Sequence, residues 1–120
     1  MSDSLFGIHA AALELRSQRM GMIASNIANA ATPGYKAKDI DFHAALAKSQ
    51  SADGKWGGDT DAAAKGAVLY RTPVMPSMDG NTVELQNEQV AFSENAVGYS
   101  STLEFIRSRV DTITRAMKGE

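Results

Sequence analysis

Cysteine is absent from the 120-residue chain, and histidine, proline and aromatic residues are scarce. The lack of cysteine excludes disulfides, thiolate metal sites and cysteine nucleophiles. His9 and His43 stand far apart and form no metal-binding spacing such as HxxxH. No Ser/His/Asp set can be assembled from helical neighbours, and no glycine-rich loop lies between a strand and a helix. We therefore predict a protein that is not an enzyme and holds no cofactor or metal.

An excess of charge and a long apolar run are also missing. The 12 basic and 14 acidic residues are mixed along the chain, so no basic patch for nucleic acid stands out. No apolar run approaches the ~20 residues that span a bilayer. Residues 1–6 lack the basic head and apolar segment of a cleavable secretory signal. We expect no nucleic-acid partner, no membrane insertion and, if the chain is exported, a route that leaves its N-terminus in place.

Both ends of the chain show the spacing of long amphipathic helices, with key residues alternately three and four apart. We predict one helix from Leu5 to about Ala30 and another from about Val83 to Met117, capped by Asn81 or Thr82 and ended by Gly119. The first seam consists of Leu5, Ile8, Ala12, Leu15, Arg19, Met22, Asn26 and Asn29. The second consists of Phe92, Ala96, Tyr99, Leu103, Ile106, Val110, Ile113 and Met117. The expected fold is mainly α, with two long terminal helices packed as an antiparallel coiled-coil-like pair.

A further apolar face on the first helix raises the question of what covers it. Leu13, Met20, Ile23 and Ile27 lie on that face, and one partner helix can cover only one side. We expect neighbouring copies to cover it, which predicts a subunit of a helical assembly whose isolated chain has loosely ordered ends. Antiparallel alignment also places Arg19 near Glu94 and Asn95, where we expect a charge-assisted contact that sets the register.

The middle of the chain reads as an irregular or short-β region within one structural domain. Asp41 is a plausible cap for a short helix from Phe42 to Lys48, and Ala67–Arg71 resembles a strand. Residues 49–66, which include Trp56, are rich in Ser, Ala, Asp and Gly and predict a flexible loop. The expected divisions are 1–31 for the first helix, 32–48 for the turn and short helix, 49–66 for the loop, 67–82 for the extended segment, and 83–120 for the last helix.

The junction after the first helix combines polar seam residues with a rigid turn. Asn26 and Asn29 end the seam, where polar residues lower stability but fix register and partner choice. Thr32-Pro33-Gly34-Tyr35 then breaks the helix, because proline lacks an N–H and glycine accepts the positive φ of a type II turn. We interpret this corner as a docking site for a protein partner. A frayed, solvated helix end and a helix-turn-helix over residues 17–40 are the alternatives, although the segment after the turn is short for a recognition helix.

These residues resemble a known family, the flagellar axial proteins of bacteria. The resemblance rests on LRSQR at 15–19, IASNIANA at 23–30 and TPGYKA at 32–37. KDIDF at 38–42, DGNTVE at 79–84 and the short length resemble the B-type proximal rod subunits of that family. By this resemblance the assembly motif comprises Arg16, Arg19, Asn26, Asn29, Thr32, Pro33, Gly34 and Tyr35.

The resemblance also implies a function. It implies a structural subunit of the proximal rod, which self-assembles into the drive shaft that transmits torque and encloses the export channel. The implied partners are other rod subunits, the basal junction protein, the MS ring and the flagellar type III export machinery. The implied location is the periplasmic part of the basal body. Another axial subunit (a C-type rod or hook-type protein), a cytosolic coiled-coil adaptor and a helix-turn-helix module remain alternatives.

Overall fold

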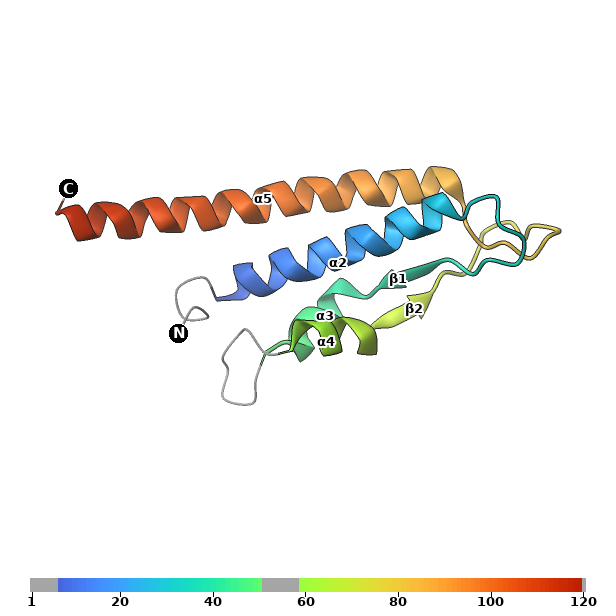
Figure 1. Ribbon diagram of the computed structural model, residues 1–120, viewed down its shortest axis with the longest axis horizontal. Helices are drawn as coiled ribbons and strands as arrows, with labels where there is room; N and C mark the ends of the chain where they lie inside the picture. Colours follow the sequence, from blue (N-terminus) through green and yellow to red (C-terminus); the bar gives the residue numbers. More distant parts are fainter. Residues whose placement is uncertain (1–6, 51–58, 120) are drawn as a thin grey trace.

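The computed structural model describes residues 7–50 and 59–119 and arranges them in three layers (Figure 1). Helix α2 (Ile8–Ala28) lies in the middle and runs antiparallel to α5 (Leu85–Lys118) on one side. The other side of α2 carries the middle of the chain: β1 (Lys38–Ile40), α3 (Phe42–Lys48), α4 (Thr60–Gly66) and β2 (Val68–Tyr70). The mainly α fold, with its antiparallel terminal helices and short-β middle region, is confirmed.

Helix α2 is covered from two sides by its own chain. Leu15, from the first predicted seam, is fully buried in a cluster with Ile40, Ala45, Ala64 and Ala67. Met22 packs against the same cluster, so these two seam residues contact the middle region rather than α5. Ile23, from the other face, is also fully buried. The chain itself therefore covers α2 from two sides. Leu13, Met20 and Ile27 of the other face stay half-buried, so their cover by neighbouring copies stays a prediction.

The line of α5 that is buried is polar or small rather than aliphatic. Its buried residues are Glu88, Ala91, Asn95 and Thr102. The predicted aliphatic seam lies beside this line, with Phe92, Tyr99, Leu103, Ile106 and Ile113 half-buried and Val110 and Met117 exposed. At the start of α2, Ile8 is exposed, and Leu5 lies outside the described residues. Polar contacts, described below, therefore occupy the place expected for an apolar seam.

The strands and the cap of α3 follow the local sequence signals. The strands β1 and β2 pair antiparallel, with Lys38 opposite Tyr70 and Ile40 opposite Val68. Asp41 caps α3 as predicted, because its carboxylate accepts a hydrogen bond from the Ala44 N–H at 3.2 Å.

Helix α4 corrects the prediction of a flexible loop over residues 49–66. Asp59 caps this helix by accepting from the Ala62 N–H at 2.9 Å. The alanines that follow favour helix, and Ala63 and Ala64 are buried. Small side chains permit close packing of α4 against α3, which composition alone did not reveal. Residues 51–58 of the expected loop, including Trp56, lie outside the described residues.

Helix α5 starts differently from the prediction and ends as predicted. It begins at Leu85 with Glu84 in the cap position and no side-chain capping bond, so neither Asn81 nor Thr82 is the cap. The Asn81 amide is used elsewhere, on the end of α2. Gly119, at φ 75°, ends the helix in the left-handed conformation that glycine adopts without strain.

Candidate functional site

The corner after α2 is a rigid turn that is tied to the loop before α5. The Tyr35 N–H donates to the Thr32 carbonyl at 3.3 Å, and Gly34 takes a φ of 74°. These features make the predicted type II turn, with proline and glycine at its two central positions. The Gly34 N–H donates to the Asp79 carbonyl at 2.9 Å. This hydrogen bond ties the turn to a segment that lies 45 residues further along the chain (from 34 to 79).

Asn81 closes the end of α2 from outside the helix. Its buried side-chain Nδ2 lies 3.0, 3.0 and 2.8 Å from the carbonyl oxygens of Asn29, Ala30 and Thr32. Asn29 in turn accepts from the Thr32 hydroxyl through its Oδ1 at 3.1 Å. Carbonyls at a helix end have no partner within the helix, so Asn81 supplies donors that α2 itself cannot.

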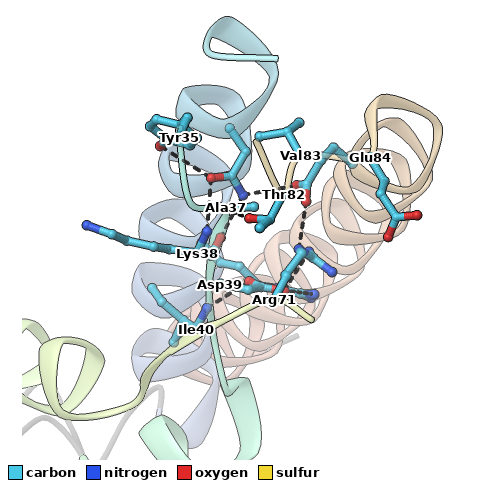
Figure 2. A network of polar contacts seen from close by, with 12 residues as sticks. Tyr35, Ala37, Lys38, Asp39, Ile40, Arg71, Thr82, Val83 and Glu84 are labelled. Atoms are coloured by element: carbon cyan, nitrogen blue, oxygen red, sulfur yellow. Dashed lines mark hydrogen bonds and ion pairs between the residues drawn. The ribbon is translucent and has the colours of Figure 1, made fainter. Parts of the chain in front are cut away.

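Asn26 acts as a hydrogen-bonding partner for strand β1. Its fully buried amide donates to the Lys38 carbonyl at 2.6 Å and accepts from the Lys38 N–H at 3.1 Å. The same Nδ2 reaches Glu88 Oε2 on α5 at 3.1 Å, and the Tyr35 hydroxyl donates to Oδ1 at 3.4 Å. Figure 2 shows these contacts between Tyr35 and Lys38. One side chain thus joins α2, β1 and α5.

Four charged side chains continue this network across the three layers. Arg19 donates to both oxygens of Asp39, at 2.8 and 2.9 Å, and Arg71 donates to Asp39 Oδ2 at 2.8 Å. Arg71 Nε forms an ion pair with Oε1 of the fully buried Glu88 at 2.6 Å, although its N–H is not aimed at that oxygen. Figure 2 shows Asp39 and Arg71 facing each other. The two arginines balance the two carboxylates, which keeps the buried charge of Glu88 compensated. We call Arg19, Asn26, Asp39, Arg71 and Glu88 the corner network.

Arg16 joins α2 to α3 and α5 beside this network. Its guanidinium lies 4.2 Å from the centre of the Phe42 ring, which is cation–π geometry. A Cβ on Gly98 of α5 would lie only 2.5 Å from Arg16 Nη1, so glycine leaves the space that this side chain occupies. Asn95 donates to the Arg16 carbonyl at 2.8 Å. Burial, and secondarily the charge of Arg19, lowers the pKa of Arg16 from its ordinary value.

The contacts of the corner network and of Arg16 hold the elements of the chain together. Among residues 7–50 and 59–119, no group of three or more His, Asp or Glu could hold a metal ion. In the same part of the chain, no helix combines the length and apolarity needed to cross a membrane. An open depression of about 610 Å³ next to the corner is lined by Val74, Met75, Glu84, Leu85, Gln86 and Asn87, which form no set of catalytic groups.

Comparison with known proteins assigns the family. A family model described as flagella basal body rod protein matches residues 6–36, which span α2 and the Pro-Gly turn. The flagellar basal body rod protein FlgB of Cereibacter sphaeroides is 46% identical over 120 residues, covering 95% of this chain and 94% of the relative. The chain belongs to the flagellar basal body rod protein family. Proteins of the same name from Aeromonas hydrophila and Salmonella typhimurium are 42% and 35% identical, each over 98% of this chain and 96% and 95% of the relative.

The structure of this rod-family chain brings most of the predicted motif residues together, but inside the subunit. Arg16, Arg19, Asn26 and Asn29 make contacts within the chain, and Tyr35 is half-buried against Asn26. Thr32, Pro33 and Gly34 are exposed on the turn. The motif thus has an inner part that fixes the corner and an exposed part at its tip.

The expected contact between Arg19 and Glu94 is replaced by the pairing of Arg19 with Asp39. That hydrogen bond is the main reason why the pKa of Arg19 is raised, with the charges of Asp39, Glu94 and Glu88 adding to it and burial opposing it. Asn95 does meet the first helix, but at the Arg16 carbonyl. Arg19 thus lies near enough to Glu94 for that charge to act on it, as the antiparallel alignment predicted, but its ion-pair partner is Asp39 of β1.

Sequence reasoning in the rod-family chain missed four residues that hold the corner. Asp39, Arg71, Asn81 and Glu88 come from four separate segments, and three of them meet only through folding. A weak signal existed for Asp39 and Arg71, because both are charged residues in or beside short strands. Nothing local marks Glu88 as buried, since glutamate in the first turn of a helix is normally exposed.

Proposed function

We propose that this rod-family protein is a non-enzymatic structural subunit of the proximal rod. In this role it assembles with other axial subunits into the shaft that transmits torque and encloses the export channel. The similarity to FlgB proteins over nearly the whole chain supports the B-type assignment over a C-type or hook-type subunit. The proposed partners are other rod subunits, the basal junction protein, the MS ring and the flagellar type III export machinery. The proposed location is the periplasmic part of the basal body, reached without cleavage of a signal peptide.

The observation that carries this proposal is a fixed corner joined to a long, incompletely covered helix. The corner network leaves its polar groups occupied inside the chain. Apolar side chains on one face of α5 remain outside, with Val110 43% and Met117 83% exposed and the half-buried Ile113 between them. Contiguous exposed apolar surface on a small protein marks an interaction site. A rigid subunit with one helix available to neighbours suits polymerisation.

The motif residues have two proposed tasks in such a subunit. Arg16, Arg19, Asn26 and Asn29 set the angle at which the middle of the chain leaves the helical pair. Thr32, Pro33, Gly34 and Tyr35 form the turn whose exposed part would face a neighbouring subunit. The five segments, 1–31, 32–48, 49–66, 67–82 and 83–120, would then act as one structural domain.

Deleting the gene and restoring it from a plasmid tests the proposal. We expect a null strain to lack rods and to be non-motile, and the wild-type gene to restore both. An Asn26→Ala variant should restore motility poorly because the corner loses its central amide, whereas Asn87→Ala, on the exposed side of α5, should restore it fully. A motile null strain with intact flagella would refute the rod function.

A further inference from the structure

The two halves of α5 carry opposite charge. From Leu85 to Glu104 the helix holds three glutamates and no lysine or arginine. From Phe105 to Lys118 it holds three arginines, one lysine and a single aspartate. Glu88 is buried against Arg71, which leaves Glu94 and Glu104 as the exposed carboxylates of the first half. Two oppositely charged surfaces of comparable length therefore lie end to end on one helix.

The acidic half presents an outward face with heptad spacing. This acidic face consists of Val90, Glu94, Val97, Ser101 and Glu104, spaced four and three apart and all exposed. Val90 and Val97 are 57% and 67% exposed, respectively. At 3.6 residues per turn this line lies away from the buried line that contacts α2. It combines two apolar positions with flanking carboxylates, as the side of a coiled-coil partner does.

The basic half presents an apolar stripe flanked by cations. This basic face begins with Leu103, at the end of the acidic half, and continues with Ile106, Val110, Ile113 and Met117; Arg107 and Lys118 lie beside it. Figure 1 shows this half of α5 continuing past the beginning of α2, and Met117 is 83% exposed. At 3.6 residues per turn, the acidic and basic faces point to opposite sides of the helix, about 180° apart. One subunit can thus offer its basic face to one neighbour and its acidic face to another.

We propose that the basic face of α5 docks on the acidic face of α5 in a second copy of this chain, with the two helices parallel. Placing Arg107 beside Glu94 of the second copy offsets the helices by about 13 residues, or about 20 Å along the axis. The same offset places Leu103 beside Val90 and Val110 beside Val97. Apolar side chains then meet at these two positions, and the Arg107–Glu94 pair, of opposite charge, fixes the register.

Parallel alignment is favoured because every copy then points the same way along the shaft. An antiparallel contact would also match one basic face with one acidic face, but it would reverse the direction of α5 from each copy to the next. A parallel, offset contact is heterologous, so each added copy leaves a face free for the next. This choice rests on the rod function proposed above.

Cross-linking between copies tests the contact in the full-length chain. Because the chain has no cysteine of its own, pairs of cysteines can be introduced without interference from native thiols. Val90→Cys with Leu103→Cys reports the parallel contact, and Val90→Cys with Met117→Cys reports the antiparallel one. Both sites of a pair lie on one straight helix about 20 Å or more apart, so a disulfide within one subunit is excluded. In cells that carry only the variant gene, we expect about fivefold more disulfide-linked dimer from the parallel pair than from the antiparallel pair.

Charge reversal in the Val90→Cys/Leu103→Cys variant, the parallel reporter, distinguishes a specific contact from cross-linking by random collision. We expect Glu94→Arg to reduce the dimer yield about fivefold and the swap Glu94→Arg with Arg107→Glu to restore it. Glu14→Arg, which makes the same change of charge on the exposed side of α2, should leave the yield unchanged. Equal yields from the two reporters, a dominant antiparallel reporter, or a swap that fails to restore the yield would each overturn the contact. If the null strain is non-motile while the reporters fail, only the contact is wrong; a motile null strain removes the rod function itself.

Discussion

Buried polar side chains determine how the two long helices align. Asn26 donates to Glu88, and Asn95 donates to the Arg16 carbonyl, so both pairs would break if α5 slid by one turn along α2. Apolar surfaces tolerate such a slip because van der Waals contacts re-form with new neighbours. A buried polar group left without a partner costs about 1–3 kcal/mol. We infer that these residues contribute less to gross stability than to the choice of one register.

Glu88 offers the most direct test of this network. We expect Glu88→Gln to lower the free energy of unfolding by about 1–3 kcal/mol, because Arg71 loses the charge of its fully buried partner. The midpoint of urea unfolding measures the change. Glu14→Gln, exposed on α2, should stay within about 0.5 kcal/mol of wild type. Equal midpoints for the two variants would show that the ion pair contributes nothing.

Gly98 tests the space that Arg16 occupies. Alanine normally favours a helix over glycine by about 1 kcal/mol, yet a Cβ here would lie 2.5 Å from Arg16 Nη1. We expect Gly98→Ala to lower stability by about 0.5–1.5 kcal/mol, since Arg16 must leave its position over Phe42.

The comparison with Gly21 and the Arg16→Ala background gives the control. A Cβ on Gly21 of α2 meets nothing within 4 Å, so Gly21→Ala should stabilise by about 0.4–1 kcal/mol. In the Arg16→Ala background, Gly98→Ala should become stabilising as well. The same effect of Gly98→Ala in both backgrounds, measured by urea unfolding, would exclude coupling between the two residues.

At the scale of elements, the sequence predicted the helix cap, the turn and the helix end that depend on short stretches of chain. The Asp41 cap of α3, the turn at Pro33-Gly34 and the end of α5 at Gly119 all follow from one residue and its neighbours. The buried line of α5 could not be found this way, because hydrophobic periodicity selects the most apolar stripe. Glu88 and Asn95 are buried only because Arg71, Asn26 and the Arg16 carbonyl lie opposite them. That information is non-local.

The loop before α5 has a pH response of its own. Hydrogen bonds from the Ser77 hydroxyl, at 2.6 Å, and secondarily the Asn81 N–H, at 3.0 Å, lower the pKa of Asp79 below its usual value. Ionised Asp79 therefore stabilises the folded chain above its unfolded pKa of about 3.9, and this contribution disappears as the pH falls through the lower folded pKa. We expect Asp79→Asn to flatten the acid side of the stability profile between about pH 5 and pH 2.

Urea unfolding at a series of pH values measures this slope. Asp111→Asn, which removes the same charge from the exposed side of α5, serves as the matched control. If the Asp79→Asn and Asp111→Asn profiles coincide across the acid range, the loop carboxylate has no part in the acid response of the fold.

At the scale of the molecule, the chain is long and thin, at 64 × 30 × 18 Å. Helix α5 has 34 residues and α2 has 21, which correspond to about 51 and 31 Å at 1.5 Å per residue. The antiparallel pair therefore cannot cover α5 over its full length with α2 alone. The sequence predicts loosely ordered ends for both helices, but the structure packs the two helices differently. Helix α2 lies between two layers, whereas α5 has a packed half and an outer half.

Hydrogen exchange on the monodisperse chain distinguishes these regions. Local opening is easiest where few buried apolar contacts hold a helix. We therefore expect amides of α5 beyond Arg107 to exchange at least about tenfold faster than those of α2 and of residues 89–104. In the assembled rod the difference should disappear, because the basic face is then covered by a neighbour. Uniform protection along α5 in the monomer would mean that the outer half is stable without a partner. That result would remove the energetic reason for assembly through this helix.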